Sequence, residues 1–209
     1  MRKWKCEVCG YIHTGDSPPD KCPVCGADKS QFTEITETDA APAAEAGQPK
    51  TPATAAVEPE APARQTAFDF LLGLVVKHHA HPIATHIPNG VIPVSVLFIL
   101  ISALLNVEVF ARAAYLNMVV VVLSLPVVLF TGWVEWQKKY KGAITPLFIT
   151  KIACAGLVSV LAFTSAAWLM IDPQVTASSG KWSFVLLNIV LLGAAGVAGH
   201  IGGKLVFKD

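Results

Sequence analysis

Charged side chains are scarce in this chain. Asp, Glu, Lys and Arg make up only 15% of its 209 residues, and the formal net charge is +1. Soluble domains carry about 25% charged residues, so the composition disfavours a wholly soluble protein. A charge so close to zero provides no strong positive field, and we expect no nucleic-acid partner. The first residues, Met1 to Cys6, contain no apolar core of the kind found in a cleavable signal peptide.

The motifs of several enzyme classes are also missing. The sequence contains no phosphate-binding loop, no dinucleotide fingerprint and no Ser-His-Asp arrangement. We therefore predict no catalytic residues, and whether the chain is an enzyme stays open at this point.

Four uncharged apolar runs account for the low charge, and each is 20 to 30 residues long. A helix needs about 20 apolar residues to cross a bilayer. We predict an all-α bundle of four transmembrane helices, at about 82–106, 113–136, 145–170 and 182–206. The segment 67–77 is too short to span; it forms either a helix in the membrane interface or an extension of the first span. The predicted membrane domain covers 67–209.

Lysines are concentrated on one side of this topology. That side holds Lys77, Lys138, Lys139, Lys141, Lys204 and Lys208, whereas the opposite loops hold only Arg112 and Lys181. The positive-inside rule places the N-terminus, the middle loop and the C-terminus in the cytoplasm. We expect a multi-pass protein of the bacterial inner membrane.

Four of the five cysteines form two pairs with the spacing of a metal site, Cys6 with Cys9 and Cys22 with Cys25. Each pair is followed by a glycine, which lets the backbone turn its amides toward the sulfurs. Four thiolates in a tetrahedron select iron or zinc. The residues alone leave these two metals open.

Residues 1–35 resemble the short rubredoxin domain found at one end of rubrerythrins. Twelve residues separate the two cysteine pairs, as in that short type. The resemblance is carried by Trp4, Cys6, Cys9, Gly10, Tyr11, Gly15, Pro18, Pro19, Cys22, Pro23, Cys25, Gly26, Ala27 and Phe32. It implies a small metal-knuckle domain with one iron on the four cysteines; the alternative is a zinc ribbon.

Residues 36–66 are rich in Ala, Pro, Glu and Thr and contain no aromatic residue. Such a segment buries too little apolar surface to fold. We predict a disordered linker that tethers the N-terminal head and lets it move, at an effective concentration of around millimolar near the membrane.

Histidines gather at the start of the first span, where His79, His81 and His86 lie. His200 lies near the end of the fourth span, and the topology brings both ends to one membrane face. Two histidines on different helices at one depth suit axial ligation of a haem. We predict that His86 and His200 share one b-type haem; the alternatives are His79 or His81 in place of His86, or a second haem. A metal ion on His81, His86 and His200 is a further alternative.

The membrane half also resembles a bacterial four-helix family of unknown function. The shared pattern is His81-Pro82, His86 and Pro88 in the first helix, with His200, Gly202, Gly203, Leu205 and Val206 in the fourth. This resemblance implies a b-type haem domain.

Together these features predict a membrane-anchored protein that transfers single electrons between a rubredoxin iron and a membrane haem or quinone. Its partners would be the membrane and a cytoplasmic redox protein, with self-association into a homo-oligomer left open. One alternative is a reductase for oxygen, peroxide or nitric oxide. The other is a non-redox module with zinc in the head.

Overall fold

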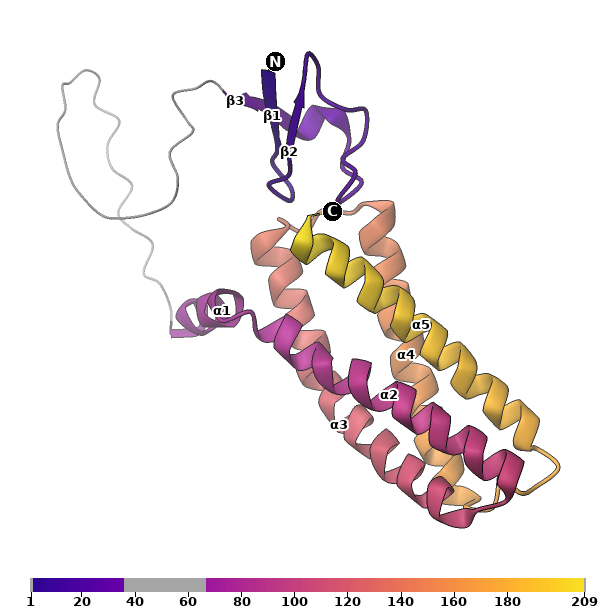
Figure 1. Cartoon of the computed structure of the whole chain (residues 1–209). Coiled ribbons are helices and arrows are strands. Elements are labelled where there is room, and N and C mark those ends of the chain that lie inside the picture. Colours follow the sequence, from indigo (N-terminus) through magenta and orange to yellow (C-terminus); the bar gives the residue numbers. More distant parts are fainter. Residues whose placement is uncertain (1, 36–66, 209) are drawn as a thin grey trace, which may run out of the picture.

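The computed structural model describes residues 2–35 and 67–208 of the chain. Figure 1 shows a small β-sheet head seated at one end of a long helical bundle. The predicted linker at 36–66 lies outside the described residues. The predicted architecture, a small four-cysteine domain plus four apolar helices able to span a membrane, is confirmed.

The head is a three-stranded antiparallel sheet in the order β2-β1-β3. Strand β1 (Arg2–Cys6) pairs with β2 (Ile12–Gly15) on one side and with β3 (Phe32–Ile35) on the other. A short 3-10 helix, η1 (Lys29–Gln31), precedes β3. The side chain of Asp28 caps η1 by accepting a hydrogen bond from the Ser30 amide at 3.0 Å. The sheet is too small for a core of its own beyond the cysteine loops.

The bundle consists of four long helices. They are α2 (Ala80–Leu105), α3 (Glu108–Lys139), α4 (Pro146–Ile171) and α5 (Lys181–Phe207). Each is long and apolar enough to cross a membrane. Helix α2 is continuous through Pro88 and Pro93. Neighbouring helices in the ring are α2–α3, α3–α4, α4–α5 and α5–α2, so α2 and α4 lie diagonally opposite each other.

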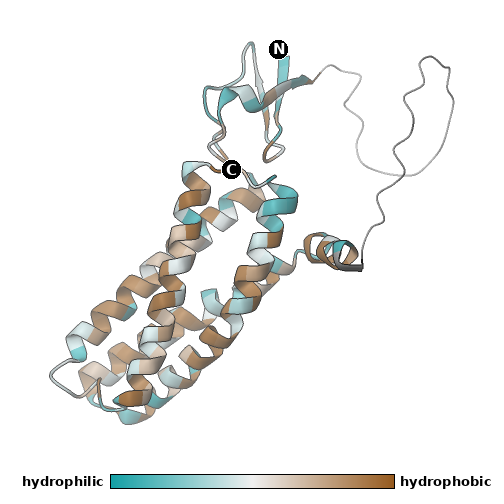
Figure 2. Cartoon of the chain, turned by 180° about the vertical axis from the view of Figure 1, so that it is seen from behind, coloured by the Kyte–Doolittle hydropathy of each residue, from teal (hydrophilic) through white to brown (hydrophobic). Residues whose placement is uncertain are grey.

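The outer surface of the bundle is apolar, as Figure 2 shows by its brown bands along all four helices. Leu123, Val160 and Leu186 are each more than half exposed. In water such a surface would be unfavourable, but in lipid it needs no cover. Inside the bundle, polar groups are paired: Ser165 donates to the amide oxygen of Asn188 at 2.8 Å, and both side chains are fully buried.

Segment 67–77 forms a separate helix, α1 (Ala67–Lys77), rather than an extension of the first span. The chain turns at His79, whose φ of 51° is in the left-handed region and breaks the helix. Asp69 of α1 forms an ion pair with Lys138 of α3 at 3.8 Å. Helix α1 is therefore held against the same end of the bundle as the head (Figure 1).

Candidate metal centre and bundle cavity

The two cysteine pairs meet in the head. The four sulfur atoms of Cys6, Cys9, Cys22 and Cys25 all lie within 4.8 Å of one another. The Sγ atoms of Cys6 and Cys25 are 3.7 Å apart, and those of Cys9 and Cys22 are 3.6 Å apart. Cys9 is partly exposed, whereas the other three are buried. The structure thus assembles the four sulfurs that the sequence predicted as metal ligands.

Two glycines make this assembly geometrically feasible. Gly10 and Gly26 have φ values of +72° and +73°, which residues with a Cβ adopt only under strain. Their amides donate to the carbonyls of Cys6 and Cys22 at 2.8 and 2.9 Å. Each turn closes tightly and aims both of its sulfurs at the same point.

The ionisation of the thiols agrees with a bound cation. Hydrogen bonding by the Cys25 thiol lowers the pKa of Cys9 to about 5. Burial raises the pKa of Cys22 to about 11, and donation to the Cys9 thiolate raises the pKa of Cys25. The Cys22 and Cys25 thiols therefore resist ionisation when no cation is bound. A metal cation overcomes this resistance because coordinating thiols are deprotonated by the ion. The four residues fit a four-thiolate metal site.

Both cysteine turns also contact the bundle. The hydroxyl of Thr145, directly before α4, donates to the carbonyl of Cys25 at 2.7 Å in a buried bond. The ammonium of Lys208 lies 3.5 Å from the carbonyl of Gly10. Lys141 forms an exposed ion pair with Glu7 at 3.7 Å. We predicted from the sequence a tethered head that moves. In this structure the head is docked, with its metal turns facing the bundle.

Behind the docked turns lies a shared apolar cluster. It joins the buried cysteines and Val24 of the head to Tyr140, Phe148 and Leu205 of the bundle. The rings of Tyr140 and Phe148 pack in a tilted arrangement with their centroids 5.0 Å apart, and Tyr140 is only 4% exposed. The cluster excludes water between the head and the bundle. Sequence reasoning missed Thr145 and Tyr140, because neither lies in a motif; only the Thr-Pro start of α4 marked Thr145 as a cap.

A cavity of about 340 Å³ opens inside the head end of the bundle, and all four long helices line it. Its wall includes Tyr140 and Leu205, which also belong to the cluster beneath the head. Polar side chains in the wall are His81, Thr85, His86, Asn89, Glu135 and Lys151. The rest of the wall is mostly apolar. The cavity wall and the cluster around the metal turns therefore share side chains.

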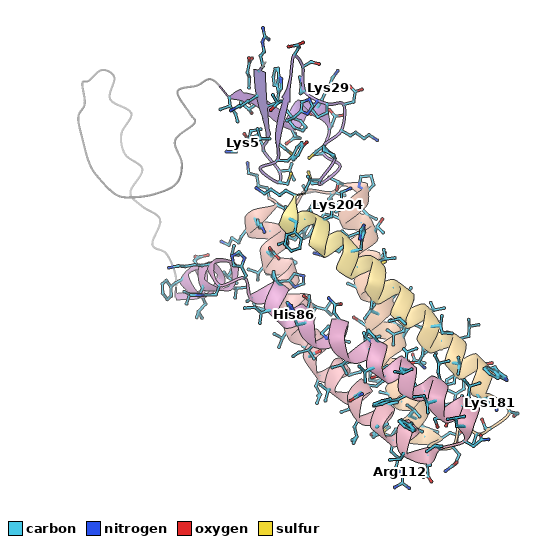
Figure 3. All side chains as sticks on the ribbon, in the orientation of Figure 1. Lys5, Lys29, His86, Arg112, Lys181 and Lys204 are labelled. Carbon is cyan, nitrogen blue, oxygen red and sulfur yellow. The ribbon has the colours of Figure 1, made fainter. Side chains whose placement is uncertain are left out.

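The structure brings only some of the predicted histidines together. His81 and His86 line the cavity, and Figure 3 labels His86 in the first turns of α2. His200 is exposed and is not part of the cavity wall, and His79 lies in the turn before α2. His81 and His86 project from the same helix, so they cannot bind opposite faces of one macrocycle. The arrangement gives no support to a haem held by His86 and His200.

The alternative of a metal ion on three histidines is likewise unsupported. Within residues 2–35 and 67–208, the four cysteines are the one group of three or more His, Cys, Asp or Glu side chains spaced to hold an ion. His81, His86 and His200 are not close enough to do so.

Two charged residues, Glu135 and Lys151, line the cavity. Glu135 forms an ion pair with Lys139, one turn further along α3, at 3.0 Å. Lys151 is half-buried and lines the cavity, with Glu135 as the acidic group that acts on it electrostatically. A lysine inside a membrane span is costly, so its place in a cavity wall marks a functional candidate.

Comparison with known families agrees with this two-part organisation. Residues 77–209 match a family described as predicted membrane protein, DUF2231. The chain belongs to this family. Residues 4–33 match the rubredoxin-like domain of rubrerythrin, so the chain is a DUF2231 membrane domain with a rubredoxin-like head. No solved structure is significantly similar to the chain.

Two curated proteins similar to this DUF2231 protein are a rubredoxin and a reverse rubrerythrin, and each match covers less than a fifth of the chain. Rubredoxin-2 of Chlorobaculum tepidum is 46% identical in an alignment of 52 residues. The alignment covers the whole of that protein and 17% of this chain. Reverse rubrerythrin-1 of Clostridium acetobutylicum is 60% identical over 37 residues, 18% of this chain. The chain spans about a fifth of that relative's length. These similarities describe the metal domain and do not extend to the membrane domain.

Proposed function

We propose that this DUF2231 protein transfers single electrons between a rubredoxin-type iron in its head and a redox-active ligand in its bundle. The head would hold one iron on Cys6, Cys9, Cys22 and Cys25. When bound, such an iron supplies a one-electron couple. The full-length similarity to a rubredoxin supports iron over zinc.

One observation carries the proposal: the metal turns face the bundle, and the buried cluster around them shares side chains with the wall of the cavity. Tyr140 and Leu205 belong to both the buried cluster and the cavity wall. Electron transfer falls off steeply with distance, so a donor buried against the wall of an acceptor cavity is favourably placed. A head that acted only on soluble partners would not need to bury its cysteine turns against the membrane domain.

The residues around the metal turns have separate tasks in this proposal. Thr145 holds the Cys25 turn at the bundle through its buried hydrogen bond. Tyr140 and Phe148 fill the gap and keep water out. Water exclusion lowers the polarity around the metal site, which is one of the factors that set its potential.

The orientation follows from the distribution of lysines. Figure 3 shows Lys204 at the head end of the bundle and Arg112 and Lys181 at the opposite end. By the positive-inside rule this distribution supports a head on the cytoplasmic side of a bacterial inner membrane, where a one-electron protein partner would meet it. Whether electrons flow into or out of the membrane depends on that partner.

The test uses membranes from cells that overproduce the full chain. The head is reduced chemically without oxygen, and return of its ferric–thiolate absorption is followed as endogenous membrane acceptors reoxidise it. We expect Tyr140→Leu to slow the return and Tyr140→Phe, which keeps the ring, to leave it unchanged. Equal rates in all three proteins would contradict a route through this interface.

The same spectra also test the alternative functions and the predicted haem. A colourless head with stoichiometric zinc would favour the non-redox module. A reoxidation that requires added oxygen, peroxide or nitric oxide would favour a reductase. A six-coordinate b-type signal that disappears in both His86→Ala and His200→Ala would restore the predicted haem, in spite of the position of His200.

A further inference from the structure

The cavity has a form and a chemistry that select one class of ligand. Small-molecule pockets in proteins occupy about 300–1,000 Å³, mostly apolar with a few placed polar groups. The cavity, at about 340 Å³, lies at the lower end of this range. That size suits one flat ring system better than a large macrocycle.

The polar groups stand on opposite walls. Lys151 comes from α4 and His81 from α2, and these two helices are diagonal in the bundle. An ammonium can only donate hydrogen bonds, so Lys151 requires an acceptor such as a carbonyl oxygen. Across the cavity, the Nδ1 of His81 lies 3.1 Å from the carbonyl of Val128. Because that carbonyl can only accept, Nδ1 carries the hydrogen, and Nε2 is left as an acceptor for a ligand hydroxyl.

The wall also has an open side that could hold a hydrocarbon tail. Gly202 and Gly203 of α5 line the cavity, and a Cβ built on either would meet no atom within 4 Å. A Cβ built on Gly199, one turn earlier, would lie 3.6 Å from the side chain of Asn89 on α2. Helices α2 and α5 are thus in contact at Gly199, and there is free space on the α5 side nearer the head.

From this arrangement we infer that the cavity is a quinone-binding site. A quinone is a flat apolar ring with an oxygen at each end. Lys151 can donate to one of these carbonyl oxygens, and once the ring is reduced the hydroxyl at the other end can donate to Nε2 of His81. Its isoprenoid tail is soluble in the lipid around the bundle. This inference rests on the proposed function, because it names the ligand that would exchange electrons with the head.

The reduction of a quinone in this cavity balances in electrons and protons. A quinone becomes its hydroquinone by taking up two electrons and two protons, and no carbon–oxygen bond breaks. Each electron corresponds to one ferrous-to-ferric change in the head, which a cytoplasmic one-electron donor protein reverses. The protons come from water at the head end of the bundle and form two O–H bonds. Lys151 donates to one ring oxygen, and Nε2 of His81 accepts from the hydroxyl formed at the other. In the opposite direction the same two electrons and two protons leave.

The experiment measures binding directly, with full-length protein in phospholipid nanodiscs and a zinc-loaded head that cannot change oxidation state. The probe is duroquinone, a quinone without a tail, in equilibrium dialysis against empty nanodiscs. We expect saturable binding to the parent protein. Gly202→Leu, which fills the cavity, should abolish it, and Lys151→Met should weaken it about tenfold through loss of a charge-assisted hydrogen bond.

Gly193→Leu is the matched control. Gly193 lies on the same helix, is exposed, has no atom within 4 Å of an added Cβ and is not part of the cavity wall. This variant should bind like the parent. Retained metal content and an unchanged thermal midpoint identify the variants that fold correctly.

Three results would overturn the inference: no saturable binding, equal loss in Gly193→Leu, or binding of oleate instead of duroquinone that Gly202→Leu abolishes. The last would assign the cavity to a lipid. Because the zinc-loaded head carries no electrons, the two proposals fail separately. Quinone binding without electron transfer would refute only the proposed function, and electron transfer without quinone binding would refute only this inference.

Discussion

Replacing Thr145 with Val should release the head from the bundle. The Thr145 hydroxyl donates to the Cys25 carbonyl at 2.7 Å in a buried bond. Valine has nearly the same shape but no donor, so the carbonyl would stay at the interface without a partner. An unsatisfied buried group of this kind costs about 1–3 kcal/mol, and each 1.4 kcal/mol is a factor of ten in affinity. We therefore expect docking to weaken about 5- to 150-fold.

The Lys141–Glu7 ion pair between the head and the bundle should contribute less to docking than the Thr145 hydrogen bond. The side chains of Lys141 and Glu7 are 68% and 42% exposed, and their ion pair spans 3.7 Å. Exposed pairs contribute about 0–1 kcal/mol because water and salt screen them. Lys141→Ala should therefore change docking less than about fivefold, and high salt should remove the difference.

The assay inserts a protease site between residues 36 and 66, cuts the chain, and measures the affinity of the two pieces on dilution in detergent. Thr145→Ser keeps the hydroxyl and serves as the control. It should bind like the parent, with Thr145→Val weaker. The Thr145 oxygen also accepts from the Phe148 amide at 3.5 Å, at the start of α4. An equal affinity for Val and parent would refute the claim that this bond holds the head.

Further predictions concern the metal, the orientation, the interface and the core. Protein made with ample iron should show ferric–thiolate absorption that bleaches on reduction; stoichiometric zinc without iron would contradict this. A reporter that works only in the cytoplasm should be active when fused to the C-terminus. A reporter that works only outside the cytoplasm should be inactive there. Burial raises the pKa of Tyr140 above its ordinary 10.0, so its contribution to docking is present below about pH 10 and is lost as pH rises through the raised value. Titrating docking in alkali should show this loss in the parent and not in Tyr140→Phe. Replacing Ser165 with Ala removes the donor to the buried Asn188 oxygen and should cost about 1 kcal/mol, seen as a lower thermal midpoint in detergent. Ser159→Ala, which removes a bond to the carbonyl of Ala155 on its own helix, should cost less.

Local patterns in the sequence determined the parts of this protein. Two cysteines three residues apart, followed by a glycine, close a turn with few other contacts, so the four sulfurs could be predicted without the fold. Apolar runs of about 20 residues specify membrane spans because the thickness of the bilayer sets their length. The choice between iron and zinc is not contained in the spacing, since four thiolates bind both metals.

Only the tertiary structure decided which residues meet. The sequence placed His86 and His200 at one depth, but depth does not fix the side of a helix on which a residue lies. With 3.6 residues per turn, each step turns a side chain by about 100°. The face of α5 that carries Gly199, Gly202 and Val206 lines the cavity, while His200 lies outside its wall. Helix rotation in the bundle is set by packing between small side chains, which no local motif records. For the same reason the docking of the head through Thr145, and the place of Lys151 opposite His81, required the folded chain.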